Sequence, residues 1–333
     1  MNSKLSIILT IYGRNEYTHR WCAFLSQNYC GSQIIIADGN SSPQPTKKII
    51  ENFKNLNITH LWIKEDNGVD DFIFKIKNAL SHSKGDYVVF ADNDDLLNEK
   101  IILKNIDRMV QHHFQIGLCE SYRFVHNKKR TVAYKLQNHP FANCMDATSR
   151  LKASIMAFPS DYIYYAIFRK DVLNNCFNSM VHRRLNYWIF MEFAITCIFA
   201  TKVSQKKLLE AFLFRDAGTF GTAKSLVDKE AFANLIFDEN FYQSYCNLCQ
   251  IVGEQAELDE VGIKKLRVYL ENEIRQRIFR RYITQKNYLP RYLIKILSYI
   301  YLLLHKKNKN AVGSRNQDLR SIDNFLKSYD NNE

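Results

Sequence analysis

The sequence VVFADNDDLL at residues 88–97 joins a short apolar segment directly to three aspartates, Asp92, Asp94 and Asp95. The apolar residues are typical of a buried strand, so the aspartates would stand together at its end. Like charges at such short distances repel each other unless a cation compensates them. We therefore expect either a basic side chain or a metal ion at this point of the chain.

The segments before these aspartates alternate between short apolar runs and amphipathic stretches. LSIILT, SQIIIAD, THLWIKED and DYVVFAD are predicted strands, and helices are predicted between them, the last of which Gly85 ends. Strands that are apolar nearly throughout are typical of a parallel sheet covered by helices on both faces. The sequence therefore predicts an α/β fold with a doubly wound, mainly parallel, Rossmann-like sheet.

The rest of the chain is less regular. FQIGLCESYRFV and RTVAYKL predict a hairpin, IMAFPSDYIYYAIFRKDVL predicts a strand running into a helix, and QKKLLEAFLFRDAG predicts one further strand. The pattern then changes to helix from about residue 219. We accordingly expect an α/β domain at residues 1–218 and a helical C-terminal region at residues 219–333.

The composition limits the classes of partner without choosing among them. The 333 residues include 46 Lys and Arg against 34 Asp and Glu, a formal net charge of +12. A basic surface attracts nucleic acid, anionic lipid or phosphorylated small molecules, but this excess lies largely in the C-terminal third, away from the aspartates. The eight cysteines lie mostly in apolar stretches and no secretory signal is evident, which indicates reduced thiols in the cytoplasm.

Polar side chains follow three of the predicted strands. Thr10 and Tyr12 follow the first, Asp38 follows the second, and the three aspartates follow the fourth. Ligands of doubly wound sheets bind beyond the carboxyl ends of the strands. We therefore expect a single binding site along this edge.

Several segments, in order, resemble those of the family 2 glycosyltransferases, which have the GT-A fold. LSIILTIYGR resembles the family's VSVIIPTYNR, IADGNSS its VDDGS, and GDYVVFADNDD its GDYIxFLDxDD. FRKDVL resembles FRRxVL, Glu192 in WIFMEF fits an acid about twenty residues later, and LEAFLFR resembles a closing strand before an Arg. The resemblance covers residue 4 to about residue 216 and is greatest to a bacterial branch with ADG and DNDD motifs.

The resemblance implies an enzyme that takes a sugar from a nucleotide-sugar donor. By this resemblance, Asp94 and Asp95 belong to a DXD-type motif and are the expected ligands of Mn²⁺ or Mg²⁺. Asp92 is expected to contact the ribose or the donor sugar. Such ions prefer oxygen ligands, so one ion offsets the charges of the aspartates and of the diphosphate together. Alternatively, an aspartate caps the helix predicted after this motif.

The resemblance also places the base of the nucleotide beside Asp38, with Thr10 and Tyr12 lining the same pocket. Alternatively, Asp38 forms an Asx-type turn with Gly39. The family's usual Arg-Asn pair falls on Ile76-Lys77, so a nucleotide-binding Arg is missing there or replaced by Lys.

Two further positions depart from the family's pattern. Ala37 stands in place of the first Asp of the second strand's usual pair, so a role of that carboxylate is not expected. A lone Glu192, preceded by Met191, stands in place of the usual Glu-Asp pair.

Glu192 is the expected general base of an inverting transfer, in which one carboxylate takes the proton from the attacking acceptor hydroxyl. Phe190, Phe193 and Trp188 are expected to desolvate Glu192 partly and raise its pKa.

Other interpretations of the acidic residues stay open. Glu192 could lie on the polar edge of a helix or pair with Arg183 or Arg184. Asp146 and Asp161 are rival candidates for the base.

Residues 288–309, YLPRYLIKILSYIYLLLHKKNK, predict an amphipathic helix with a basic end. The apolar run is too short and too interrupted for a standard membrane span. It predicts either a helix in the surface of an anionic membrane or one packed on the catalytic domain. The expected location is the cytoplasm or the cytoplasmic face of the inner membrane, where a lipid-linked acceptor would be found.

Two other functions compete with sugar transfer. A nucleotidyltransferase also uses acidic metal ligands, but it usually has a Gly-rich basic loop after the first strand, and TIYGRNEYT has one Gly and one Arg. A non-enzymatic nucleic-acid-binding protein would suit the net charge, yet the expected site is acidic and no nucleic-acid-binding signature is evident. The sequence therefore favours extension of a surface polysaccharide or lipopolysaccharide, with no nucleic-acid partner.

Overall fold

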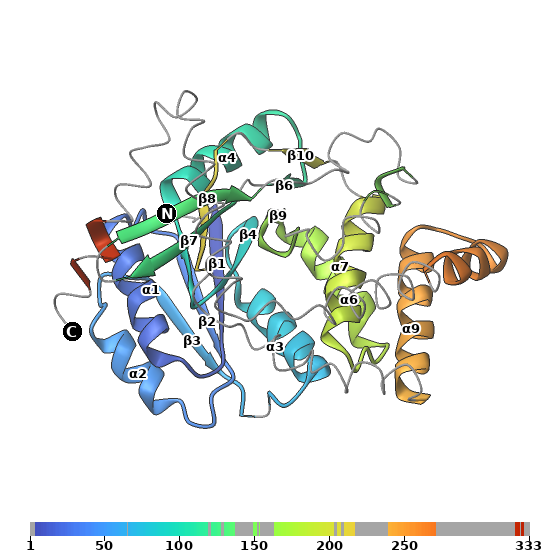
Figure 1. The fold of residues 1–333 in the computed structure, drawn as a ribbon, viewed down its shortest axis with the longest axis horizontal. Coiled ribbons are helices and arrows are strands. Elements are labelled where there is room, and N and C mark those ends of the chain that lie inside the picture. The colour runs from blue at the N-terminus through green and yellow to red at the C-terminus, as the bar shows by residue number, and fades with distance from the viewer. Residues whose placement is uncertain are drawn as a thin grey trace.

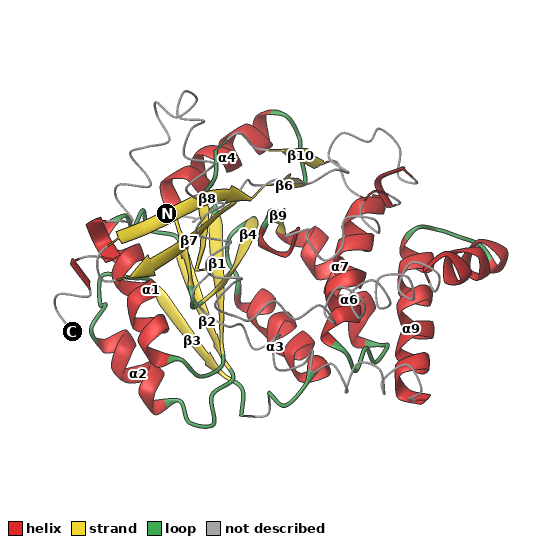
Figure 2. Ribbon diagram, viewed as in Figure 1, coloured by secondary structure: helices red, strands yellow, loops and turns green. Residues whose placement is uncertain are grey.

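The structure is a computed structural model of the chain (Figures 1 and 2). It describes residues 4–64, 66–118, 121–127, 130–136, 149–151, 153, 163–202, 205–207, 210–216, 239–270, 324–326 and 328–329.

The described strands of the central sheet have the order β10-β6-β9-β4-β1-β2-β3. Their bounds are β1 Leu5–Ile11, β2 Gln33–Asp38, β3 Ile58–Trp62, β4 Tyr87–Asp92, β6 Ile116–Leu118, β9 Ile167–Arg169 and β10 Gln205–Lys207. β4, β1, β2 and β3 run parallel, whereas β9 is antiparallel to both of its neighbours. The expected doubly wound, mainly parallel sheet is confirmed.

Helices cover both faces of this sheet. One apolar cluster joins it to α1 Asn15–Gln27, α2 Gln44–Glu51 and α4 Glu99–Gln111, and a second joins it to α3 Val69–His82, α6 Lys170–Val181 and α7 Trp188–Lys202. Along β1, Ile7 and Leu9 enter the first cluster and Ile8 enters the second. This period of two explains why strands buried on both faces are apolar nearly throughout.

A second sheet lies beside the carboxyl end of β4, with the order β5-β11-β7-β8. Its strands are β5 Asp95–Leu97, β7 Ser121–Asn127, β8 Arg130–Leu136 and β11 Leu213–Asp216. β7 and β8 form a hairpin as predicted, but the predicted first strand, FQIGLCESYRFV, is wrong in part, because its first half forms β6 of the central sheet.

The prediction of one strand in QKKLLEAFLFRDAG is wrong, because this segment supplies β10 to the central sheet and β11 to the second sheet. Glu210 lies between these two strands and forms ion pairs with Lys104 and Arg108 of α4.

The helical C-terminal region is described only in part. α9 Glu239–Gln255 packs on α7, and its apolar residues share the cluster that contains α3, α6 and α7. Residues 288–309 lie outside the described residues. No helix within the described ranges combines the length and hydropathy needed to cross a membrane. The domain boundary at residue 218 stays a prediction.

Gly85 is a point of close backbone approach rather than the end of a helix, since α3 already ends at His82. Its N–H donates to Ser6 Oγ at 2.9 Å, and an added Cβ would lie 2.6 Å from the backbone of Leu5. Only a residue without a side chain fits between α3 and β1 here.

We predict that Gly85→Ala lowers the free energy of unfolding by about 3 kcal/mol, because the added methyl group overlaps backbone that cannot rotate away. The measurement is urea unfolding of the full chain. Gly68→Ala is the matched control: a Cβ at Gly68 meets nothing within 4 Å, so the loss should stay below about 1 kcal/mol. Equal losses in the two variants would contradict the role assigned to Gly85.

Candidate functional site

The three aspartates lie in a tight connection between the two sheets. Asp92 is the last residue of β4 and Asp95 the first of β5, with Asp94 in the turn between them. One carboxylate oxygen from each of the three lies within 4.8 Å of the others. The sequence prediction that these side chains gather at the strand end is therefore confirmed.

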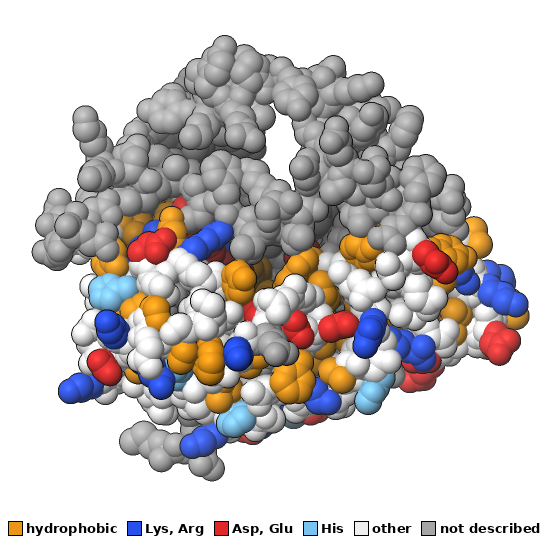
Figure 3. Space-filling model, turned by 90° about the horizontal axis from the view of Figure 1, so that it is seen from below, with side chains coloured by type: hydrophobic (Ala, Val, Ile, Leu, Met, Phe, Trp, Pro, Cys, Tyr) orange, Lys and Arg blue, Asp and Glu red, His pale blue; other side chains and the backbone are white. Residues whose placement is uncertain are grey.

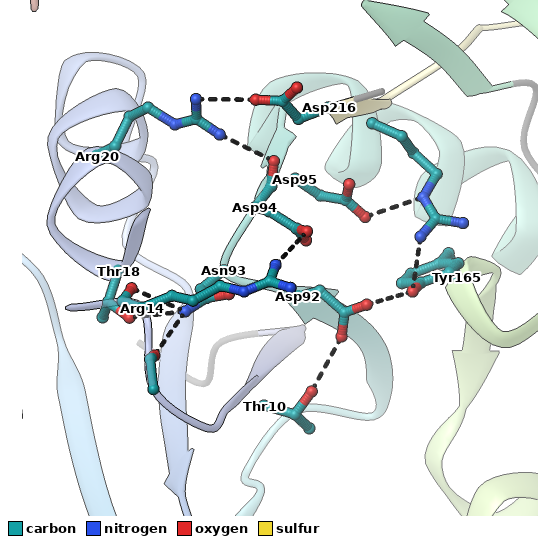
Figure 4. A network of polar contacts seen from close by, with 12 residues as sticks. Thr10, Arg14, Thr18, Arg20, Asp92, Asn93, Asp94, Asp95, Tyr165 and Asp216 are labelled. Carbon is teal, nitrogen blue, oxygen red and sulfur yellow. Dashed lines mark hydrogen bonds and ion pairs between the residues drawn. The ribbon is translucent and has the colours of Figure 1, made fainter. Parts of the chain in front are cut away.

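Asn93 ties this turn to the loop between β1 and α1. Its Nδ2 donates to the carbonyls of Gly13 and Arg14 at 3.3 and 3.1 Å, and it lies 3.1 Å from Thr18 Oγ1. Arg14 adopts a left-handed conformation with φ 55° and ψ 55°, which is uncommon outside glycine. The loop is thereby held so that Arg14 points back toward the acidic turn (Figure 4).

The alternative that an aspartate caps the following helix is wrong. α4 begins at Glu99, and its N-cap is Asn98, whose side chain accepts a hydrogen bond from the Ile101 N–H. A short strand separates the aspartates from the helix, which leaves their carboxylates directed toward the site.

Among the described residues, three arginines offset the charge of this turn (Figure 4). Arg14 Nη1 lies 2.8 Å from Asp94 Oδ2, and Arg215 Nε lies 3.2 Å from Asp95 Oδ2. Arg20 binds the Asp94 carbonyl and forms an ion pair with Asp216.

Asp92 is held from two sides. Thr10 Oγ1 donates to its Oδ1 at 3.1 Å, across the β1–β4 pair, and Tyr165 OH donates a short hydrogen bond to its Oδ2. Burial and then the charge of Asp94 raise the pKa of Asp92, while Arg215, Tyr165 and Thr10 lower it. Thr10 and Asp92, both predicted from the sequence, are thus in direct contact.

The donor set suits a hard divalent cation. Burial raises the pKa of Asp95 to about 8, against the lowering effect of Arg215. Asp95 Oδ2 is buried, and within the described part of the chain no hydrogen bond reaches it. The cluster offers three carboxylates, one with a buried oxygen that contacts Arg215 Nε at 3.2 Å, and such oxygen ligands are the kind that Mg²⁺ or Mn²⁺ prefers.

Asp38 is buried completely, and both its oxygens have partners within the fold. Oδ1 accepts from the Asn40 N–H at 2.9 Å, and Oδ2 lies 2.8 Å from His60 Nε2 of β3. The Asx-type turn is therefore present, although its amide comes from Asn40. Tyr12, directly after β1, is 57% exposed.

Lys75 is the buried cation of this edge. Its side chain is 2% exposed and pairs with Asp66, and its Nζ lies 3.5 Å from the Ile11 carbonyl at the end of β1. Ile76 is buried in the apolar core and Lys77 is half-buried, whereas Lys75, one residue before the predicted pair, is the lysine of α3 that contacts the end of β1. A Cβ on Gly39 would overlap the Asp66 carboxylate, which explains a glycine after Asp38.

Glu192 lies on the exposed side of α7. The prediction that neighbouring aromatic residues desolvate it is wrong for Phe190 and Phe193, which are buried in the core. Successive residues of a helix point about 100° apart, so these rings turn away from it. Arg183 pairs with Glu254, and Arg184 lies 3.9 Å from Asp70.

The charges of Glu192 and Asp92 both act on the hydroxyl of Tyr164. It belongs to the short 3₁₀ helix η2 Ile163–Tyr165, and its ring stacks on Phe90 of β4. Burial raises its pKa well above the usual value, with further contributions from the charges of Asp92 and Glu192. Glu192 therefore lies within electrostatic range of the same tyrosine as Asp92. Asp146 and Asp161 lie outside the described residues.

The sequence analysis missed several residues of the site: Arg14, Arg20, His60, Asp66, Lys75, Tyr165 and Asp216. A usable signal existed for Arg14, which directly follows the glycine that ends the first strand segment. The others meet the site through contacts distant in the chain.

The chain belongs to glycosyl transferase family 2. The family model named "Glycosyl transferase family 2" matches residues 6–186, more than half of the 333 residues. This stretch contains the ends of β1, β2 and β4 with Asp92, Asp94 and Asp95, whereas Glu192, Arg215 and Asp216 lie after it.

Solved structures share the fold of this chain. The chain is similar to S. aureus TarS residues 1–349 in complex with UDP-GlcNAc, with a TM-score of 0.51, 16% identity, and coverage of 81% of this chain and 72% of that one. A second TarS 1–349 structure gives a TM-score of 0.50, 16% identity, and coverage of 86% and 93%. At this identity the likeness shows the fold alone, which is the GT-A fold.

A curated relative is similar over a shorter stretch. It is named "Uncharacterized glycosyltransferase YfnE", from Bacillus subtilis strain 168, and is 28% identical over 106 residues. The match covers 31% of this chain and 26% of the relative's length.

We predict that Lys75→Met destabilises the protein by about 3–5 kcal/mol, because it leaves the Asp66 carboxylate buried without its cation. Adding Asp66→Asn should recover part of this loss. Urea unfolding of the two single variants and the double variant gives the coupling energy. Strictly additive losses would contradict a direct Lys75–Asp66 interaction.

Proposed function

We propose that the protein is an inverting, divalent-metal-dependent glycosyltransferase. It moves a sugar from a nucleotide-sugar to a hydroxyl of a glycan or lipid-linked acceptor in bacterial surface polysaccharide or lipopolysaccharide synthesis. The observation that carries the proposal is the cluster of Asp92, Asp94 and Asp95 at the end of β4, beside Thr10 of β1.

The acidic cluster supports metal dependence. Asp94 and Asp95 would hold Mn²⁺ or Mg²⁺, and the ion, when bound, stabilises negative charge on the departing diphosphate. Arg14 and Arg215 contact these same carboxylates, so they fix the positions of the oxygens and keep cationic groups close to where the diphosphate arrives.

The ends of β1 and β2 support a nucleotide beside the cluster. Thr10 and Asp92 already hydrogen-bond each other, which suits Asp92 to the ribose or donor sugar. Tyr12 supplies an exposed ring directly after β1, and Asp38 ends the neighbouring strand β2, on the side of the site where the base would lie. The UDP-GlcNAc complex of TarS makes a nucleotide diphosphate sugar a reasonable class of donor.

Glu192 is the proposed general base. It is exposed and therefore accessible to an acceptor, and it shares Tyr164 with Asp92 as an electrostatic neighbour. A carboxylate on the acceptor side takes the proton from the attacking hydroxyl while the diphosphate leaves from the opposite face, and the anomeric configuration inverts.

The proposed location is the cytoplasm or the cytoplasmic face of the inner membrane.

Figure 3 shows Lys, Arg, Asp and Glu side chains interspersed with apolar ones on the described part of one face. Such a mixed surface does not favour nucleic acid as the partner, despite the net charge of +12.

We predict that Asp94→Asn and Asp95→Asn abolish the stabilisation that a UDP-sugar gives in the presence of Mn²⁺. Each variant removes a charged oxygen ligand while keeping the side chain's shape. The measurement is the melting temperature with a panel of nucleotide-sugars, with Mn²⁺ and with EDTA; for the wild type, ligand at 100 times its Kd adds about 2.7 kcal/mol.

Asp107→Asn is the matched control, since Asp107 lies on the exposed surface of α4 and pairs with Lys4. It should respond to donor and Mn²⁺ like the wild type. Unchanged metal-dependent stabilisation in both cluster variants would refute the proposed metal site.

We predict that Glu192→Gln lowers kcat about 10²–10⁴-fold with little change in the KM for the donor, because it removes the proton acceptor and leaves the nucleotide site intact. The measurement is steady-state release of the nucleoside diphosphate with an accepted sugar acceptor. Glu239→Gln, on α9, serves as the control. A comparable loss in Asp146→Asn or Asp161→Asn, with Glu192→Gln fully active, would move the base to that residue.

A further inference from the structure

The last described residues of the chain pack far from the helices that precede them. Residues 324–326 and 328–329, here called the return segment, lie beside α1, whereas α9 lies at the opposite end of the molecule (Figure 1). Phe325 and Leu326 are 4% and 1% exposed. They share an apolar cluster with residues from four other elements: Phe24, Leu96, Phe124 and Phe214.

This cluster lies directly behind the acidic site. β5 and β11 pair antiparallel, with Asp95 opposite Arg215 and Leu96 opposite Phe214. Successive side chains of a strand point to opposite faces. One face of this short ladder therefore carries the Asp95–Arg215 ion pair, and the other carries the two apolar side chains that the return segment covers.

The return segment also contacts α1. The Tyr329 hydroxyl lies 2.8 Å from His19 Nδ1, and the Phe325 ring meets the Phe24 ring edge-on at 5.0 Å. The same helix carries Arg20, which binds the acidic turn and β11. One short segment thus touches α1 and β11, which supply Arg20 to Asp94 and Arg215 to Asp95.

We propose that the return segment is a positioning element of the donor site, and that Phe325 is its principal residue. By filling the space behind β5 and β11, it holds Asp95 and Arg215 in register for the cation and the diphosphate. The inference rests on the proposed function, because it takes the acidic cluster as the metal site. Residues that support metal ligands from behind typically change metal affinity about 10–100-fold when they are replaced.

The test compares Phe325→Ala and Phe325→Leu in the full-length chain. The measurement is the apparent Kd of Mn²⁺ from thermal stabilisation in saturating UDP-sugar, together with KM and kcat for the donor. The alanine variant should bind Mn²⁺ about tenfold more weakly and raise the KM for the donor. The leucine variant should remain close to the wild type, because it keeps apolar volume behind the ladder.

Phe241→Ala is the matched control for a general loss of stability. Phe241 is 9% exposed and packs on α7, away from β5 and β11. It should lower the melting temperature while leaving the Kd of Mn²⁺ at the wild-type value.

A second variant, Tyr329→Phe, keeps the ring and removes the hydroxyl that lies 2.8 Å from His19 Nδ1, so it decides the question if Phe325→Ala does not fold. It should weaken Mn²⁺ binding in the same direction by less than tenfold. Wild-type Mn²⁺ affinity in every folded return-segment variant would overturn the positioning role alone. Absence of Mn²⁺-dependent donor binding in the wild type would overturn the proposed function and this inference with it.

Discussion

Repulsion among four carboxylates is the constraint around which this molecule is arranged. Asp92, Asp94, Asp95 and Asp216 converge where the two sheets meet, and among the described residues three arginines, from the loop before α1, from α1 and from β11, pair with the last three of them. Because each arginine comes from an element other than the acidic turn, offsetting the repulsion also fixes α1 and the second sheet against β4. The same ion pairs therefore balance the charge and hold the tertiary structure. A cation added at this point would bind carboxylates whose positions are already fixed.

The sequence was sufficient for the features that depend on local pattern. Apolar runs such as β1 predict buried strands, parallel strands bring their carboxyl ends to one edge, and the β1–β4 register then sets Thr10 against Asp92. It was insufficient where partners are distant: Tyr165 reaches Asp92 across 73 positions and Arg20 reaches Asp216 across 196. Local sequence patterns do not predict contacts between residues so far apart. The side chains that complete the site can therefore be identified only in the folded structure.

One error has a geometric origin. Surrounding Glu192 with its aromatic neighbours treats closeness in sequence as closeness in space. A helix turns by about 100° per residue, so one step separates an exposed carboxylate from a buried ring. One step likewise separates Lys75, which reaches the end of β1, from Ile76 in the apolar core.

The left-handed Arg14 gives a physical reason for the asparagine within the acidic motif. A non-glycine residue in this conformation costs about 1–3 kcal/mol, and such strain persists only where the surroundings hold it. Asn93 supplies that support by donating to the carbonyls of Gly13 and Arg14 from within the acidic turn itself. The asparagine thus fixes the backbone from which Arg14 reaches Asp94, while the neighbouring aspartates stay available to ligands. An aspartate at position 93 would add a negative charge and remove the Nδ2 donor. The motif therefore combines carboxylates, which can bind a cation, with one amide, which fixes the backbone of the neighbouring loop.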